Sequence, residues 1–106
     1  MQNMTVLPLV DAIFAITSAP ENAVICTREP FSWGAESVIA QYTEDFRVPK
    51  DVQLKGFKYF LGKEDVVDLL DKIAAKRASR ETQAEFVAHY AMFDAYPYWF
   101  DDLQER

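Results

Sequence analysis

Apolar positions recur at helical spacing in three segments of the chain. In residues 5–18 the apolar pattern is interrupted mainly by Asp11, and Pro8 suits a first helical turn because its missing N–H would be unpaired there. Residues 64–77 and residues 79–95 each place apolar side chains three and four positions apart, with charged side chains between them. We therefore expect three helices, of which the first is well buried.

Three shorter segments are rich in β-branched and aromatic residues and are bounded by turn residues. They are residues 23–27, 36–43 and 57–61. In the second segment, one side of a strand would hold Val38, Ala40 and Tyr42, and the other side Ser37, Ile39 and Gln41. The first two segments are joined by a short loop and should pair antiparallel, whereas residues 50–54 should form a single helical turn. The pattern predicts one α+β domain, residues 1–106, with a small antiparallel three-stranded sheet packed with about three helices in the order α-β-β-β-α-α.

The last predicted helix leads into an aromatic and acidic tail. Ser79 is a good N-cap because its hydroxyl can accept a hydrogen bond from a free N–H of the first turn, and Pro97 should end the helix near Ala95. The tail then holds Tyr96, Tyr98, Trp99, Phe100, Asp101 and Asp102. Packing Trp99 and Phe100 against the body would order it, but the side chains of an extended chain alternate, so not all four aromatics can point inward. Two interpretations stay open: the aromatics complete a small core, which fits Phe100 best, or the tyrosines and Trp99 form a surface.

The connector between the first two strands, residues 28–34, also contains two large aromatic side chains. Phe31 and Trp33 lie between the turn residues Pro30 and Gly34. A connector does not need such side chains for solubility. They either cap the edge of the core or are presented to a partner, and the sequence leaves both alternatives open.

Charge is distributed unevenly along the chain. The 106 residues include 17 Asp and Glu against 11 Lys and Arg, which gives a net charge of −6. Residues 1–46 and 81–106 are acidic, whereas residues 47–80 are basic. Such a chain is poorly suited to binding phosphate backbones directly and better suited to a basic protein partner. Without a leader-like segment or a long apolar run, we expect a cytoplasmic protein that does not contact a membrane.

Few residues suit catalysis or metal binding. His89 is the only histidine, which excludes a two-histidine metal site, and Cys26 lies in an apolar segment where burial makes a thiol a poor nucleophile. The three glycines lack the spacing of a phosphate-binding loop. We expect no enzyme activity, no metal and no cofactor. A carboxylate-dependent enzyme is the weaker alternative, with pairs drawn from Glu29, Glu36, Asp94 and Asp101.

Three short stretches resemble the immunity proteins of bacterial polymorphic-toxin and contact-dependent growth inhibition systems. They are REPFSW at residues 28–33, GFKYFL at residues 56–61 and DAYPYW at residues 94–99. The resemblance implies a cytoplasmic antitoxin that binds a cognate toxin domain, often a basic nuclease, and blocks its active site or a surface that it needs. It supplies no residue roles.

The expected partner-binding site combines the acidic tail with aromatic side chains. It consists of Trp33, Asp94, Tyr98, Trp99, Asp101, Asp102 and Glu105. The carboxylates would meet Lys or Arg on the toxin and set the association rate, whereas the aromatics would lose their water on binding and set the residence time. The alternative is a phage-encoded inhibitor of a host defence nuclease that imitates nucleic acid, against which the basic middle segment argues.

Overall fold

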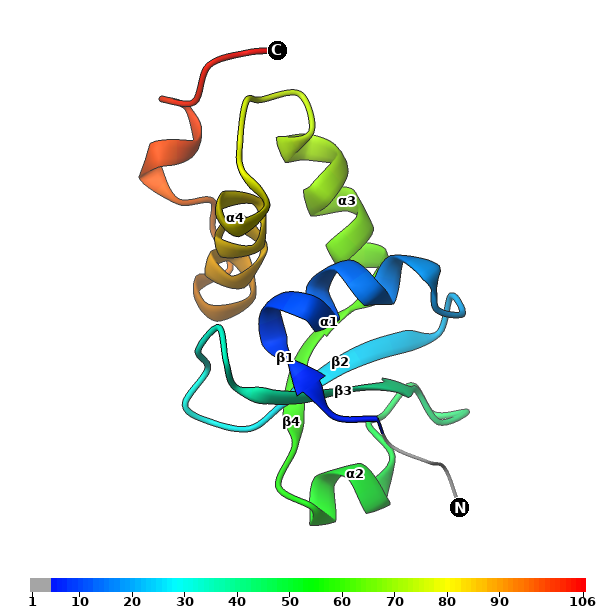
Figure 1. The fold of residues 1–106 in the computed structure, drawn as a ribbon. Coiled ribbons are helices and arrows are strands. Elements are labelled where there is room, and N and C mark those ends of the chain that lie inside the picture. The colour runs from blue at the N-terminus through cyan, green and yellow to red at the C-terminus, as the bar shows by residue number, and fades with distance from the viewer. Residues whose placement is uncertain (1–4) are drawn as a thin grey trace.

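The computed structural model describes residues 5–106, and a four-stranded antiparallel sheet lies at their centre (Figure 1). The strand order is β1-β3-β2-β4, with bounds Leu7–Pro8 (β1), Ala23–Thr27 (β2), Glu36–Gln41 (β3) and Lys58–Gly62 (β4). The central strand β2 pairs antiparallel with both β3 and β4, as expected for its short connection to β3. Every residue of β2 is buried because neighbouring strands cover its edges and helices cover both of its faces.

The predicted three-stranded sheet is wrong by one strand, because residues assigned to the first helix form β1. Leu7 pairs with Ser37 and Pro8 pairs with Glu36 at the edge of the sheet. Pro8 has no N–H to donate, which suits an edge strand, and its extended backbone makes it the N-cap of the helix that follows. A strand of two residues is too short to show an alternating pattern.

Four α-helices of residues 5–106 surround the sheet instead of about three. They are α1 (Leu9–Ala15), α2 (Lys50–Leu54), α3 (Lys63–Ile73) and α4 (Arg80–Phe93). The additional one, α2, is the single turn expected after Pro49, and short 3-10 turns follow α1 and α4 at Ile16–Ser18 and Tyr98–Phe100. The order of strands and helices is therefore β-α-β-β-α-β-α-α. None of the helices in residues 5–106 is long and apolar enough to cross a membrane.

The two faces of the sheet carry separate apolar clusters. Helices α1, α3 and α4 lie on one side of the sheet and α2 on the other (Figure 1), and the larger cluster fills the first side while the smaller one packs against α2. In β3, Val38 and Ala40 belong to the smaller cluster together with Val52 of α2, whereas Ile39 packs against the larger one. The alternation predicted for this strand is confirmed.

Helix α4 begins as the sequence predicts. The hydroxyl of Ser79 accepts a hydrogen bond from the N–H of Thr82 at 3.1 Å. The helix ends at Phe93, and Asp94 follows in the left-handed conformation with φ 54°, so the reversal comes slightly before the end expected near Ala95. This reversal returns the tail along α4, where it can pack against the side of the helix.

Candidate interaction surface

Exposed apolar side chains gather where α4 ends and the tail begins. Of the nine large hydrophobic residues that are exposed in residues 5–106, four lie within seven consecutive positions: Met92, Phe93, Tyr96 and Tyr98. We call these four the α4-end patch. Tyr98 is the most exposed of the nine, with 89% of its surface accessible. Such a concentration differs from singly scattered surface hydrophobics and is typical of an interaction site.

Carboxylates lie beside the α4-end patch. Asp94 falls within it in the sequence, and Asp101 and Asp102 follow the 3-10 turn that carries Tyr98; all three are exposed. Glu105 differs from them because it forms an ion pair with Lys76 of the α3–α4 connection at 2.8 Å. Among residues 5–106, therefore, Asp94, Asp101 and Asp102 form no ion pair and lie close in sequence to the exposed aromatics, whereas Glu105 has a partner within the protein.

The tail aromatics divide between core and surface. Phe100 is 8% exposed and stacks on Phe86 of α4 with a centroid distance of 4.7 Å, and Trp99 is half-buried, edge-on to the same ring at 6.3 Å. The core interpretation is confirmed for Phe100, and Trp99, which was expected at the partner-binding surface, also packs partly against the body. The expectation of an extended tail is wrong, because Tyr98–Phe100 form a 3-10 turn closed by a hydrogen bond from the Phe100 N–H to the Pro97 carbonyl at 3.1 Å. Successive side chains of such a turn point in three directions, which leaves Tyr98 outside.

Two lysines stand over the tail rings and were not identified as part of this site from the sequence. The ammonium of Lys72 lies 5.1 Å from the centre of the Tyr96 ring, and that of Lys76 lies 5.1 Å from the Phe100 ring. Their four-residue separation within the predicted helix of residues 64–77 was a visible signal, although α3 ends at Ile73 and Lys76 follows it. The ring that each lysine covers depends on the return of the tail. These two cations therefore help to hold the tail against the protein, and the negative charge of the tail lies on its exposed carboxylates.

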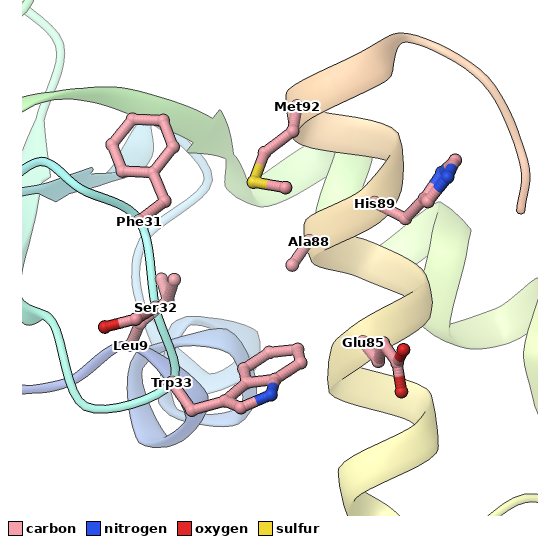
Figure 2. Close-up of a pocket in the computed structure, with 8 residues that line it drawn as sticks. All are labelled: Leu9, Phe31, Ser32, Trp33, Glu85, Ala88, His89 and Met92. Carbon is pink, nitrogen blue, oxygen red and sulfur yellow. The ribbon is translucent and has the colours of Figure 1, made fainter.

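Trp33 lies in a different place, on a groove formed by the β2–β3 loop and α4. Its indole extends from the loop towards α4, and Met92 extends from α4 towards the loop (Figure 2). We call this hollow, with a volume of about 340 Å³, the loop–α4 groove. Its principal lining side chains are Phe31, Trp33, Glu85, Ala88, His89 and Met92. Of the loop aromatics, Phe31 caps the core, since it packs edge-on to Phe60 at 5.3 Å, whereas Trp33 is 43% exposed and its presentation to a partner stays a prediction.

The seven predicted partner-binding residues thus fall into two groups on different faces of α4. Trp33 meets the face that carries Glu85 and Ala88, whereas the tail packs on Phe86. Phe86 is offset by about 100° from Glu85 around the helix axis, because each residue turns an α-helix by that angle. None of the other six predicted residues lines the loop–α4 groove within the described part of the chain.

Cys26, His89, Glu29 and Glu36, which were considered for catalysis or metal binding, are buried or paired within the protein. Burial of Cys26, which is fully inaccessible, raises the pKa of its thiol from 9.0 to about 11. The Nδ1 of His89 lies 2.9 Å from the carbonyl oxygen of Ala95, and since a carbonyl only accepts, this nitrogen donates. Glu29 and Glu36 form ion pairs with basic side chains, and no group of three metal-ligating residues gathers within residues 5–106.

Comparisons with known proteins return nothing similar. No protein-family model matches the chain, and no significant match is found among curated proteins or among solved structures. Any function must therefore be argued from the surface of the protein.

Proposed function

We propose that this protein is an antitoxin of the immunity-protein type, which binds a basic toxin domain and neutralises it. The observation that carries the proposal is the α4-end patch with Asp94, Asp101 and Asp102 beside it. Aromatic side chains dominate the energy of protein interfaces when they become buried, and charges around them select the partner and speed its approach. The patch would meet an apolar area on the toxin that is surrounded by Lys and Arg.

Tyr98 is the central anchor in this proposal. Its neighbours in the sequence are held by the protein, since Pro97 is buried and Trp99 is half-buried. The 3-10 turn that fixes them orders the Tyr98 backbone before any partner arrives. An aromatic side chain on an ordered backbone loses less conformational entropy on binding than one on a mobile tail. Trp99 contributes indirectly, by supporting the turn that presents Tyr98.

The position of Asp94 also supports a role in recognition. It caps the C-terminus of α4 in the left-handed conformation, where glycine or asparagine is usual. Its negative charge also lies at the negative end of the helix dipole, which is unfavourable. A carboxylate at this position does not serve the stability of the helix, but it is well placed to meet a cation on a partner.

Neutralisation would follow from coverage of the toxin's own basic surface. A nuclease-type toxin needs Lys and Arg to hold a phosphate backbone. Carboxylates that occupy those side chains would compete directly with the nucleic acid. The action would take place in the cytoplasm, where a toxin of this kind meets its target.

Binding kinetics with a toxin domain encoded beside this gene would test the proposal. Tyr98→Ala should weaken binding about 30-fold, mainly through faster dissociation, as for an interface hot spot. Leu54→Ala is the matched control because Leu54 is 78% exposed on α2, on the other side of the sheet. It should leave binding unchanged.

The carboxylates have a matched control of their own. Asp101→Asn with Asp102→Asn should slow association, whereas Glu44→Gln with Asp45→Asn removes the same charge from two other adjacent exposed acids and should have a smaller effect. The proposal is wrong if no basic toxin domain binds. The site is wrong if a toxin binds and the Tyr98 and Asp101/Asp102 variants behave like their controls.

A further inference from the structure

The loop–α4 groove is apolar along both walls and open to solvent. Trp33 forms part of one wall and is 43% exposed, and Met92 forms part of the other and is 46% exposed. The buried side chain of Leu9 also lines it. An occupant must therefore offer an apolar portion long enough to lie between an indole and a thioether.

The wall that carries Trp33 is fixed by backbone hydrogen bonds. The N–H of Leu9 donates to the carbonyl of Ala35 at 3.0 Å, and the N–H of Val10 donates to the carbonyl of Trp33 at 3.3 Å. The loop thus satisfies two N–H groups of the first turn of α1, which have no partner within the helix. Phe31 adds a side-chain anchor through its contact with Phe60 at 5.3 Å. The groove is preformed, so binding need not order the loop.

The polar chemistry of the groove selects a cation. Glu85 is an exposed lining residue and forms no ion pair with any residue of the described chain. The face of the Trp33 indole is also electronegative and attracts cations, with arginine favoured because its planar guanidinium stacks on the ring. His89 does not compete for the carboxylate, since its Nδ1 is engaged by Ala95 and its ring extends away from Trp33 and Met92 (Figure 2).

We propose that the loop–α4 groove binds an arginine side chain of the protein partner. The methylene stem would lie between Trp33 and Met92, and the guanidinium would stack on the indole and pair with Glu85. Arginine combines the apolar stem with the charged, planar end that these walls require. The identity of the partner rests on the proposed function, but the preference of the groove for arginine does not.

A titration with a single amino-acid derivative tests the groove without a partner protein. The chain has two tryptophans, so the indole N–H resonance of Trp33 can report on the groove while that of Trp99 serves as an internal reference. The probe is N-acetyl-arginine methylamide, and the control ligand is N-acetyl-citrulline methylamide, which has the same shape and no charge. We expect a saturable shift at Trp33 with millimolar affinity for arginine, about fivefold weaker for citrulline, and no shift at Trp99.

Two variants separate a direct contact from a general charge effect. Glu85→Gln should reduce arginine binding towards the level of citrulline, and the remaining difference should reflect stacking on the Trp33 indole. Glu81→Gln removes the same charge one helical turn earlier, from a residue that does not line the groove, and should retain most of the binding. Equal shifts with arginine and citrulline, no saturable shift at Trp33, or equal effects of the two variants would each overturn the inference.

The failures of the two proposals remain distinguishable. If a toxin domain binds and Tyr98→Ala weakens it, but arginine and citrulline are equivalent in the titration, the groove inference fails and the proposed function stands. If arginine binds in a Glu85-dependent manner but no toxin domain does, the groove inference stands and the proposed function fails.

Discussion

Asp94 gives the sharpest prediction at the scale of a single residue. Asp94→Asn removes a negative charge from the C-terminus of α4 and keeps a side chain that tolerates the left-handed conformation. We expect the free energy of unfolding to rise by about 0.3–1 kcal/mol at low salt, measured by urea denaturation. The charge of Asp94 raises the pKa of Tyr90, so the same variant should lower that pKa in an ultraviolet titration. A less stable variant would show that the carboxylate has a structural role after all.

The buried thiol of Cys26 should make the stability of the folded protein depend on pH in the alkaline range. Burial raises the thiol pKa from 9.0 to about 11, so the neutral thiol is favoured in the folded state. Its contribution is complete below about pH 9 and is lost as the pH rises towards 11, because in that range the unfolded state releases the proton first. The slope from this group approaches about 1.4 kcal/mol per pH unit.

Comparison with Cys26→Ala isolates the contribution of the thiol. Tyrosines also titrate at high pH, and Tyr42 has a pKa raised to about 12 by burial, so the difference between the two pH profiles is the informative quantity. The variant should lose stability less steeply between pH 9 and 11. Parallel profiles would contradict the assignment. The thiol should also resist alkylation in the folded protein.

At the scale of elements, the sequence was sufficient to predict elements whose formation depends mainly on neighbouring residues. The bounds of β2 and the cap at Ser79 are confirmed because a short apolar segment between turn residues and a hydroxyl before an amphipathic segment act locally. The strand β1 was missed because it exists only through pairing with β3. The 3-10 turn at Tyr98–Phe100 was missed for a similar reason, since it is stabilised by packing on Phe86.

Because the tail packs on α4, a change at this contact should reduce the stability of the protein and the order of the tail together. Phe86 is fully buried and touches the rings of Tyr96, Trp99 and Phe100. Phe86→Ala should cost about 3–5 kcal/mol of unfolding free energy and expose Trp99, which would shift its fluorescence to longer wavelength. Phe93→Ala, on the same helix but 62% exposed, is the control and should change stability by less than about 0.5 kcal/mol. Equal effects of the two changes would contradict the packing described for the tail.

At the scale of the whole molecule, the antiparallel α+β class was predictable, but the arrangement of the candidate site was not. The sequence indicated aromatics beside acids in the tail, and the structure places Tyr98 with Asp101 and Asp102 in this manner. It could not indicate that Trp33 faces α4, because the two are separated by about half of the chain and meet only after the sheet forms. Long-range packing leaves no periodic trace in either segment.

Charge across the whole molecule predicts how binding responds to salt. The net charge of −6 would attract the proposed basic toxin at long range, and salt screens such attraction beyond about 10 Å at 0.1 M. Raising the salt concentration should therefore slow association and leave dissociation nearly unchanged, as measured by surface plasmon resonance. In Tyr98→Ala the salt dependence should persist while dissociation becomes faster. A salt effect confined to dissociation would place the carboxylates inside the contact and assign them no role in steering.

The two hydrogen bonds that tie the β2–β3 loop to α1 make the amide protons of Leu9 and Val10 useful reporters. Amides in the first turn of a helix ordinarily exchange quickly with solvent, because they have no partner within the helix. Here both donate to carbonyls of the loop, so their exchange requires the loop to detach from α1. Deuterium uptake at these two positions would measure how often the β2–β3 loop detaches from α1, and an occupant bound to Trp33 should slow it.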